Sequence, residues 1–172
     1  GLRREDANRI EKTVPGVKRV LPMLTKRMTA EHDRREVECQ LIGTFPYYPE
    51  FTQAEMVVGQ FLNEEEENSR VSSCVISHQL AQRLFAGHDP LKETIVVSGY
   101  ESSQVLQVKG VLKELVGSEK LPQLPDSMGR SITANVYVPL STFNALYGVK
   151  NVDRSVGNLK LESVELTEIR VE

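Results

Sequence analysis

Alternating apolar and polar side chains predict a half-buried β-strand over residues 35 to 44, with the apolar positions on one face. Residues 17 to 29 form a second apolar-rich segment, and the polar stretch from 30 to 33 between the two predicts a long hairpin. Pro22 interrupts the first segment and predicts an edge or a bulge there, because proline cannot donate a backbone hydrogen bond to a neighbouring strand.

Apolar residues spaced three or four apart predict helices over residues 4 to 14 and 78 to 86. The second helix follows a compact apolar strand at 71 to 76. Ser77 stands where an N-cap side chain would bind the first turn, and Gly87 stands where a C-cap would end the helix.

Further strands are predicted at residues 95 to 97, 105 to 112 and 132 to 138. Pro139 ends the last of them, and Ser141 can cap a short helix that carries Phe143 and Leu146. Strands and helices follow one another irregularly, with hairpins, and this order predicts an α+β fold of mixed sheets and short helices.

The segment from Gly43 to Phe51 has the most unusual local composition, because it combines aromatic residues with two prolines. We expect no regular helix there and a short helical turn after it, before Gly59. Its aromatic residues are candidates for a partner contact, because aromatic side chains bury a large area with few rotatable bonds. The alternative is that they cover the core. These residues are Phe45, Tyr47, Tyr48 and Phe51.

Composition narrows the class of protein. The chain has 172 residues, of which 40% are hydrophobic and 26% charged, so a folded globular domain is expected. A formal net charge of -3 does not favour nucleic acid as a partner. No stretch approaches the roughly 20 apolar residues of a membrane span. The chain starts at Gly1 and stops within an alternating segment, so we expect membrane anchors in flanking sequence.

Cys39 and Cys74 are the two cysteines, and neither belongs to a pattern typical of zinc ligands. A disulfide between them in an oxidising compartment would contribute roughly 4 kcal/mol. We favour the alternative of two buried free thiols, because both lie in apolar, strand-like segments.

The sequence contains few residues in patterns suited to catalysis or metal binding. His32, His78 and His88 match no metal-binding spacing, and we expect surface or capping roles for them. The acidic run Glu64 to Glu67 lacks the ligand pattern of a calcium loop and is expected to be solvated. No nucleophile elbow or phosphate-binding loop is present. We therefore expect no enzyme activity, and no catalytic, cofactor-binding or metal-binding residue.

The order of several short motifs resembles the periplasmic core domain of MacB-like ABC transporter permeases, the group that includes FtsX-like permeases. The most specific is Asp89-Pro90-Leu91-Lys92-Glu93-Thr94-Ile95, which is similar to the family's DPLGKxI, with Lys-Glu in place of Gly-Lys. The other motifs are Val14-Pro15-Gly16-Val17, Leu41-Ile42-Gly43-Thr44, Gly59-Gln60-Phe61-Leu62, Leu84-Phe85-Ala86-Gly87, Val108-Lys109-Gly110-Val111 and Val136-Tyr137-Val138-Pro139-Leu140.

The resemblance implies a two-lobed periplasmic core domain. We expect residues 1–45 and 131–172 to form the first lobe and residues 46–130, approximately, to form the inserted one. Gly110 is expected to permit a bulge or a close backbone approach within its strand. The motif positions belong to turns and core, and none of them is a chemical site.

The resemblance also implies a function. In the family, this domain is the extracytoplasmic, periplasmic portion of an inner-membrane protein, and it couples cytoplasmic ATP hydrolysis to export or efflux through lobe motion and partner docking. The implied partners are an ABC ATPase subunit or domain and a periplasmic adaptor protein or outer-membrane channel. We expect a homodimeric or heterodimeric permease, whose isolated fragment can be monomeric. The alternative is a free-standing extracytoplasmic ligand-binding or sensory domain, which would contain a deep apolar pocket.

Overall fold

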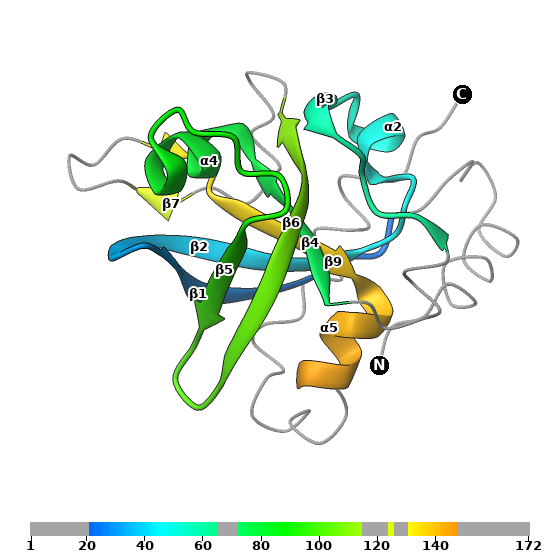
Figure 1. The fold of residues 1–172 in the computed structure, drawn as a ribbon. Helices are drawn as coiled ribbons and strands as arrows, with labels where there is room; N and C mark the ends of the chain where they lie inside the picture. The colour runs from blue at the N-terminus through cyan, green and yellow to red at the C-terminus, as the bar shows by residue number, and fades with distance from the viewer. Residues whose placement is uncertain (1–20, 65–71, 115–123, 126–130, 148–172) are drawn as a thin grey trace, which may run out of the picture.

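The computed structural model describes residues 21–64, 72–114, 124–125 and 131–147 (Figure 1). The predicted opening helix at 4 to 14 and the chain after Tyr147 lie outside these residues. The strands are β1 Leu24–His32, β2 Arg35–Thr44, β3 Glu55–Gly59, β4 Ser73–Ser77, β5 Thr94–Ser98, β6 Ser103–Lys113, β7 Leu124–Pro125, β8 Ser131–Ile132 and β9 Asn135–Pro139. The helices are α2 Tyr48–Thr52, α4 His78–Phe85 and α5 Leu140–Tyr147.

The main sheet closes on itself. Its strand order is β3-β6-β4-β9-β2-β1-β5, and β5 pairs again with β6. Strand β6 is long enough to pair with β5 at its start and with β3 at its end, while β4 runs along its other side. The β2–β9 and β4–β6 pairs are parallel and the others antiparallel. This mixed sheet with short helices confirms the predicted α+β class.

The β1–β2 hairpin confirms the predicted strand at 35 to 44 and corrects its partner. Strand β1 begins at Leu24, after Pro22, and continues to His32. The turn is therefore only Asp33 and Arg34, not residues 30 to 33, and both have positive φ, of 46° and 69°. Such a turn suits the right-handed twist of two antiparallel strands, so pairing continues to the tip.

The segment after β2 contradicts the expectation of no helix. Helix α2 spans Tyr48–Thr52 with a proline in its first turn, where the missing N–H would have no helical partner. Gln53 ends α2 in the left-handed conformation, with φ of 59°. Strand β3 then occupies residues that had been expected to form a helical turn.

Helix α4 begins where predicted, with Ser77 at the N-cap position, but the way its two ends are capped differs from the prediction. The Ser77 hydroxyl makes no capping bond; it donates to the Thr133 carbonyl oxygen at 2.6 Å and accepts from the Asn135 N–H at 3.0 Å. Ser77 is also the last residue of β4, so the neighbouring chain competes for its side chain. At the other end, Ala86, with φ of 49°, is the left-handed C-cap in place of Gly87.

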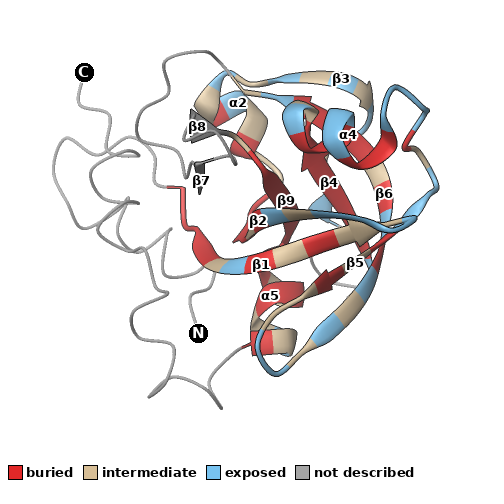
Figure 2. Cartoon of the chain, turned by 90° about the vertical axis from the view of Figure 1, so that its left-hand side faces the viewer, coloured by how far each residue is buried: buried red, intermediate tan, exposed pale blue. Residues whose placement is uncertain are grey.

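Burial explains why β9 shows no half-buried pattern. All five residues of β9 are buried, because each of its faces packs against one of two apolar clusters. Figure 2 shows this buried strand inside the molecule, with α4 above it and α5 below it in this view, and both helices contribute side chains to the same apolar cluster. Ile132, predicted to begin the strand, instead belongs to β8, which pairs with β7 in a separate two-stranded sheet.

The two predicted lobes share the main sheet. Strands β1, β2 and β9 come from the first predicted lobe, and β3 to β6 come from the insertion. The β4–β9 pairing joins them directly. The lobe boundaries therefore stay a prediction from the family resemblance, while the main sheet runs continuously through strands of both predicted lobes.

Candidate functional site

The aromatic segment after β2 lies largely in the core. Phe45, Tyr48 and Phe51 are at most 4% exposed, and Tyr47 is partly buried with its ring 5.8 Å from that of Phe45. This burial supports the alternative that the aromatic residues cover the core. A partner contact through the segment stays a prediction, and Tyr47 is the side chain of the four that retains some exposure.

A buried polar cluster was not predicted from the sequence. Glu114, directly after β6, accepts hydrogen bonds through Oε1 from the hydroxyls of Tyr48, at 2.9 Å, and Tyr137. Asn135 Nδ2 donates to the Tyr137 hydroxyl oxygen at 3.0 Å. The Phe61 ring packs 5.8 Å from each of the two tyrosine rings. The cluster therefore links α2, β9 and the end of β6.

Burial governs the ionisation of this cluster. It raises the pKa of the Glu114 carboxyl, and the hydrogen bonds from Tyr137 and Tyr48 act in the opposite direction. Burial also raises the pKa of both tyrosine hydroxyls well above the usual range. Within the described residues, Glu114 Oε2 and Asn135 Oδ1 have no hydrogen-bond partner. This arrangement is typical of a structural network rather than of an acid and base facing a substrate.

Cys39 and Cys74 are free and fully buried, as favoured from the sequence. Strand β9 lies between β2 and β4, which carry them. Two strand spacings amount to roughly 10 Å, more than the Cα separation of about 7 Å that a disulfide tolerates. Burial raises the pKa of the Cys39 thiol to about 12 and raises that of Cys74 as well, so neither is a reactive thiolate.

Tyr100, which the sequence did not single out, is fully exposed. It lies between β5 and β6, where the Gly99 N–H donates to the Ser102 carbonyl oxygen at 2.8 Å. The Ser102 hydroxyl reaches the Tyr147 hydroxyl oxygen at 3.2 Å and so ties this hairpin to α5. An aromatic residue between two strand patterns is the signal that could have identified it. Its exposure makes it a candidate contact residue.

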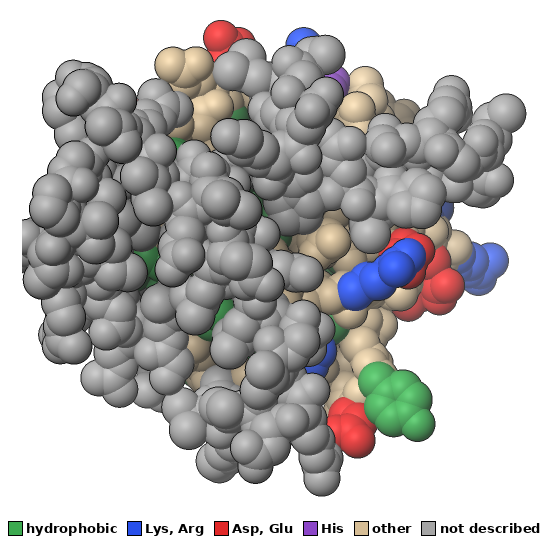
Figure 3. Space-filling view, turned by 180° about the vertical axis from the view of Figure 1, so that it is seen from behind, with side chains coloured by type: hydrophobic (Ala, Val, Ile, Leu, Met, Phe, Trp, Pro, Cys, Tyr) green, Lys and Arg blue, Asp and Glu red, His purple; other side chains and the backbone are tan. Residues whose placement is uncertain are grey.

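Charges of both signs lie close together on the described surface, as Figure 3 shows for one face. Arg27 Nε donates to Glu38 Oε1 at 2.5 Å across the exposed side of β1 and β2. This hydrogen bond lowers the pKa of the Glu38 carboxyl and raises that of the Arg27 guanidinium. The described surface around this pair is mixed in charge, and it does not resemble a nucleic-acid-binding face.

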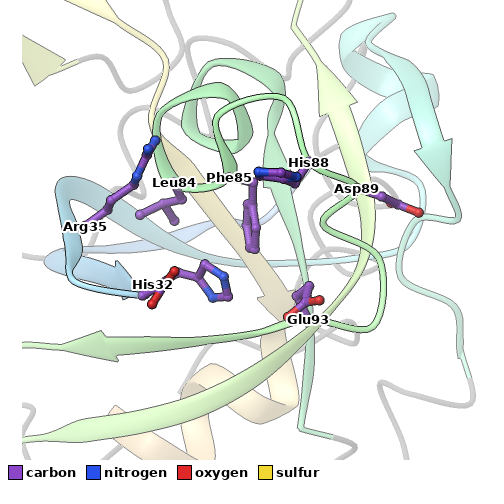
Figure 4. A pocket seen from close by; sticks show the side chains of 8 residues that line it. His32, Arg35, Leu84, Phe85, His88, Asp89 and Glu93 are labelled. Carbon is purple, nitrogen blue, oxygen red and sulfur yellow. The ribbon is translucent and has the colours of Figure 1, made fainter.

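Two of the three histidines line a cavity of about 290 Å³ (Figure 4). It lies between the tip of the β1–β2 hairpin, the end of α4 and the turn into β5. Its lining consists of His32, Asp33, Arg35, Leu84, Phe85, His88, Asp89 and Glu93. His78, at the start of α4, is not part of it. No sequence motif groups these residues, because it is the antiparallel pairing of β1 with β5 that brings the hairpin tip beside the turn into β5.

Within the described residues, no group of three or more His, Cys, Asp or Glu side chains is placed to hold a metal ion. None of the described helices has the length and apolar character needed to cross a membrane. The most specific sequence motif is structural: Asp89 Oδ1 accepts from the Leu91 N–H at 3.0 Å and fixes the turn between α4 and β5.

Known proteins are similar to this chain in sequence. The sequence profile described as the MacB-like periplasmic core domain matches residues 1–168. "Macrolide export ATP-binding/permease protein MacB" of Vibrio parahaemolyticus is 25% identical over 143 residues, which is 83% of this chain and 20% of that protein. The protein of the same name from Bdellovibrio bacteriovorus is 27% identical over 110 residues, 64% of this chain and 16% of that protein. The chain thus spans at most a fifth of these relatives.

Two solved structures have the same fold. The extracellular domain of the noncanonic ABC-type transporter YknZ from Gram-positive bacteria matches with a TM-score of 0.65 and 21% identity, over 99% of this chain and 89% of that one. The periplasmic region of MacB from Actinobacillus actinomycetemcomitans matches with a TM-score of 0.65 and 18% identity, over 96% and 72% of the two chains. With the profile match over nearly its whole length, the chain belongs to the MacB-like periplasmic core domain family.

Proposed function

We propose that this chain is the non-catalytic, extracytoplasmic domain of an ABC transporter permease, and that it couples cytoplasmic ATP hydrolysis to export by moving as a rigid unit and docking a partner. The observation that carries the proposal is the family match over residues 1–168, together with a likeness in fold to the extracellular domain of an ABC-type transporter over 99% of the chain.

The closed sheet supports a role in transmitting motion. Six strands pair on both sides, so displacing one of them requires breaking hydrogen bonds to two neighbours. Helices α4 and α5 pack on this sheet through buried side chains, among them Leu80, Leu84 and Phe143. A domain built this way transmits a displacement with little internal deformation.

The proposal includes partners. They are an ABC ATPase subunit or domain, reached through membrane helices outside this sequence, and a periplasmic adaptor protein or outer-membrane channel. The permease forms a homodimer or heterodimer in an inner membrane, with this domain on the periplasmic side. Tyr100 and the partly buried Tyr47 are the aromatic residues through which we expect docking.

The alternative of a free-standing ligand-binding domain predicts a deep apolar pocket. The cavity at the end of α4 has mainly charged or histidine side chains in its lining, which gives that alternative less support. The parent gene separates the two, because a permease domain is flanked by hydrophobic helices and a free-standing domain is not.

The test is a distance measurement in the full-length permease reconstituted with its ATPase. A spin label at Tyr100→Cys is well exposed, and the native thiols Cys39 and Cys74 are buried and stay unlabelled. We expect the distance between the labels of the two permease copies to differ between the ADP-bound and ATP-trapped states.

The control is an internal distance. A second label at Glu55→Cys, in a doubly labelled copy diluted with unlabelled permease, reports the distance between β3 and the β5–β6 hairpin. For a rigid unit this distance is the same in both nucleotide states. The proposed coupling is overturned if the distance distribution between the two copies is the same in both nucleotide states. It is also overturned if the internal distance changes as much as the distance between the copies.

A further inference from the structure

The cavity at the end of α4 is biased towards cations. Its lining holds three carboxylates, from Asp33, Asp89 and Glu93, and a single guanidinium, that of Arg35. Arg35 Nη1 donates to the carbonyl oxygen of Arg83, in the last turn of α4, at 3.4 Å. This positive charge is therefore paired with the end of the helix. The carbonyl end of a helix itself carries partial negative charge. An incoming positive group is therefore favoured here.

The histidine opposite these carboxylates has a fixed tautomer. His32 Nδ1 lies 2.9 Å from the Thr94 carbonyl oxygen. Because a carbonyl can only accept, Nδ1 carries the hydrogen, and Nε2 of the neutral ring is left as an acceptor. The His32 ring packs against that of Phe85, with centroids 4.3 Å apart. The cavity thus has an aromatic wall that ends in a hydrogen-bond acceptor.

Figure 4 shows how the lining side chains are arranged. The Phe85 side chain projects between His32 on one side and Glu93 on the other, and His88 lies next to it at the end of α4. Asp89 points away from these groups, in agreement with its bond to the Leu91 N–H. Glu93, more than Asp89, is the carboxylate placed to meet a ligand beside the aromatic wall.

Size and ligand geometry distinguish the kinds of cation. The described residues place no three ligating side chains around a common point for a metal. The cavity, at about 290 Å³, is also far larger than a single ion and approaches the size of small-molecule sites. Aromatic faces attract ammonium and guanidinium groups.

We propose that this cavity binds an ammonium or guanidinium group carried on a short alkyl chain. Glu93 would pair with the charge, His32 Nε2 would accept one N–H, and the alkyl chain would pack against Phe85. The source is either a free amine or a lysine or arginine side chain of a polypeptide. The inference does not depend on the proposed coupling function, because binding is measured on the 172-residue chain alone.

The test is an NMR titration of the ¹⁵N-labelled chain with three probes. Agmatine represents a free amine, Nα-acetyl-arginine amide represents a polypeptide side chain, and Nα-acetyl-citrulline amide is its neutral isostere. We expect saturable shifts of backbone amides between Phe85 and Glu93 with one or both cationic probes, and none with citrulline. Binding by agmatine alone identifies a free amine as the source, and binding by the arginine amide identifies a side chain.

Two matched variants assign the effect to the cavity. Glu93→Gln should weaken binding at least about fivefold, since it removes the paired charge at almost constant shape. Glu55→Gln changes another exposed acid, on β3, that does not line the cavity, and it should leave the affinity unchanged. The proposal is overturned if the citrulline probe causes equal shifts, or if Glu93→Gln binds with unchanged affinity. It is also overturned if neither organic cation causes shifts, including the case in which zinc chloride alone saturates the site.

Discussion

Glu114 is an ionisable side chain whose environment changes when the chain folds. It is largely buried and accepts hydrogen bonds from two buried tyrosine hydroxyls. Its folded pKa is raised above the ordinary value of 4.5, with burial as the main cause. In the folded chain the proton is therefore held at pH values where the unfolded chain has already lost it.

The raised pKa of Glu114 makes the folded chain less stable as pH rises. Below the unfolded pKa both states carry the proton, and this group does not disfavour folding. As pH rises from the unfolded pKa through the folded pKa, the unfolded state binds fewer protons than the folded state. The free energy of unfolding therefore falls over this range. We expect Glu114→Gln to remove this decrease, because the amide keeps an acceptor for Tyr48 and Tyr137 and carries no charge.

The measurement is urea unfolding of both chains at a series of pH values from 4 to 8. Glu55→Gln, a change to an exposed side chain, is the matched control and should keep the slope of the original sequence. If Glu114→Gln shows the same decrease in unfolding free energy as the original sequence, the carboxyl is not the group responsible.

This cluster also shows what could not be predicted at the scale of single residues. Glu114 is 66 residues from Tyr48 and 23 from Tyr137 along the chain. Nothing local to Glu114 indicates burial, since it follows an exposed lysine at the end of β6. The two cysteines, by contrast, were predicted correctly because each lies within an apolar strand segment, where burial is a local property.

At the scale of elements, the β1–β2 turn stores strain that a single substitution can relieve. Arg34 has φ of 69°, a conformation that costs a residue with a Cβ atom about 1–2 kcal/mol. Glycine adopts this conformation without that cost, but it loses more backbone freedom on folding, which costs about 0.5–1 kcal/mol. We expect Arg34→Gly to raise the free energy of unfolding by about 0.5–1 kcal/mol.

The measurement is the midpoint of urea unfolding. Lys113→Gly provides the matched comparison, because Lys113 is an exposed basic residue of β6 without positive φ, where glycine has only its entropic cost and should lower stability. A decrease in stability for Arg34→Gly of the same size as for Lys113→Gly would contradict the argument from strain.

Elements with one buried face were predicted well, and the others were not. Strand β2 alternates over much of its length because one face meets the core there, and its predicted bounds agree with the structure. Strand β9 is buried on both faces, so period-2 alternation could not define it. Helix α2 was missed because proline was treated as excluding a helix, although the first turn tolerates it.

At the scale of the whole molecule, the resemblance predicted the family, and the closed sheet emerged only from the structure. Closure depends on β6 pairing with β4 on one side and with β5 on the other, and hydrophobic pattern alone does not specify such pairing. One expectation from the sequence does bear on closure, namely that Gly110 permits a bulge or a close approach. The β4–β6 register shifts between Cys74 and Val75, whose partners are Val108 and Gly110.

Gly110 is therefore where a local change should affect the entire barrel. A Cβ atom there would lie 2.4 Å from the Gln60 carbonyl oxygen and 2.7 Å from Met56 Cε. The first is backbone and cannot rotate away, so an alanine must push β6 away from β3 and disturb its pairing with β4 as well. We expect Gly110→Ala to lower the free energy of unfolding by about 1–3 kcal/mol.

Gly87→Ala is the matched comparison, because Gly87 has φ of 89° but nothing within 4 Å of an added Cβ, so its cost is strain alone, about 1–2 kcal/mol.

Thermal unfolding should be followed in parallel by tyrosine near-ultraviolet circular dichroism and by maleimide labelling of Cys74. If the sheet is one cooperative unit, both probes shift together in Gly110→Ala, and by at least as much as in Gly87→Ala. A shift in the tyrosine signal without earlier exposure of Cys74 would mean that β3 and α2 unfold apart from the barrel, and the sheet would then not be the rigid unit on which the proposed coupling depends.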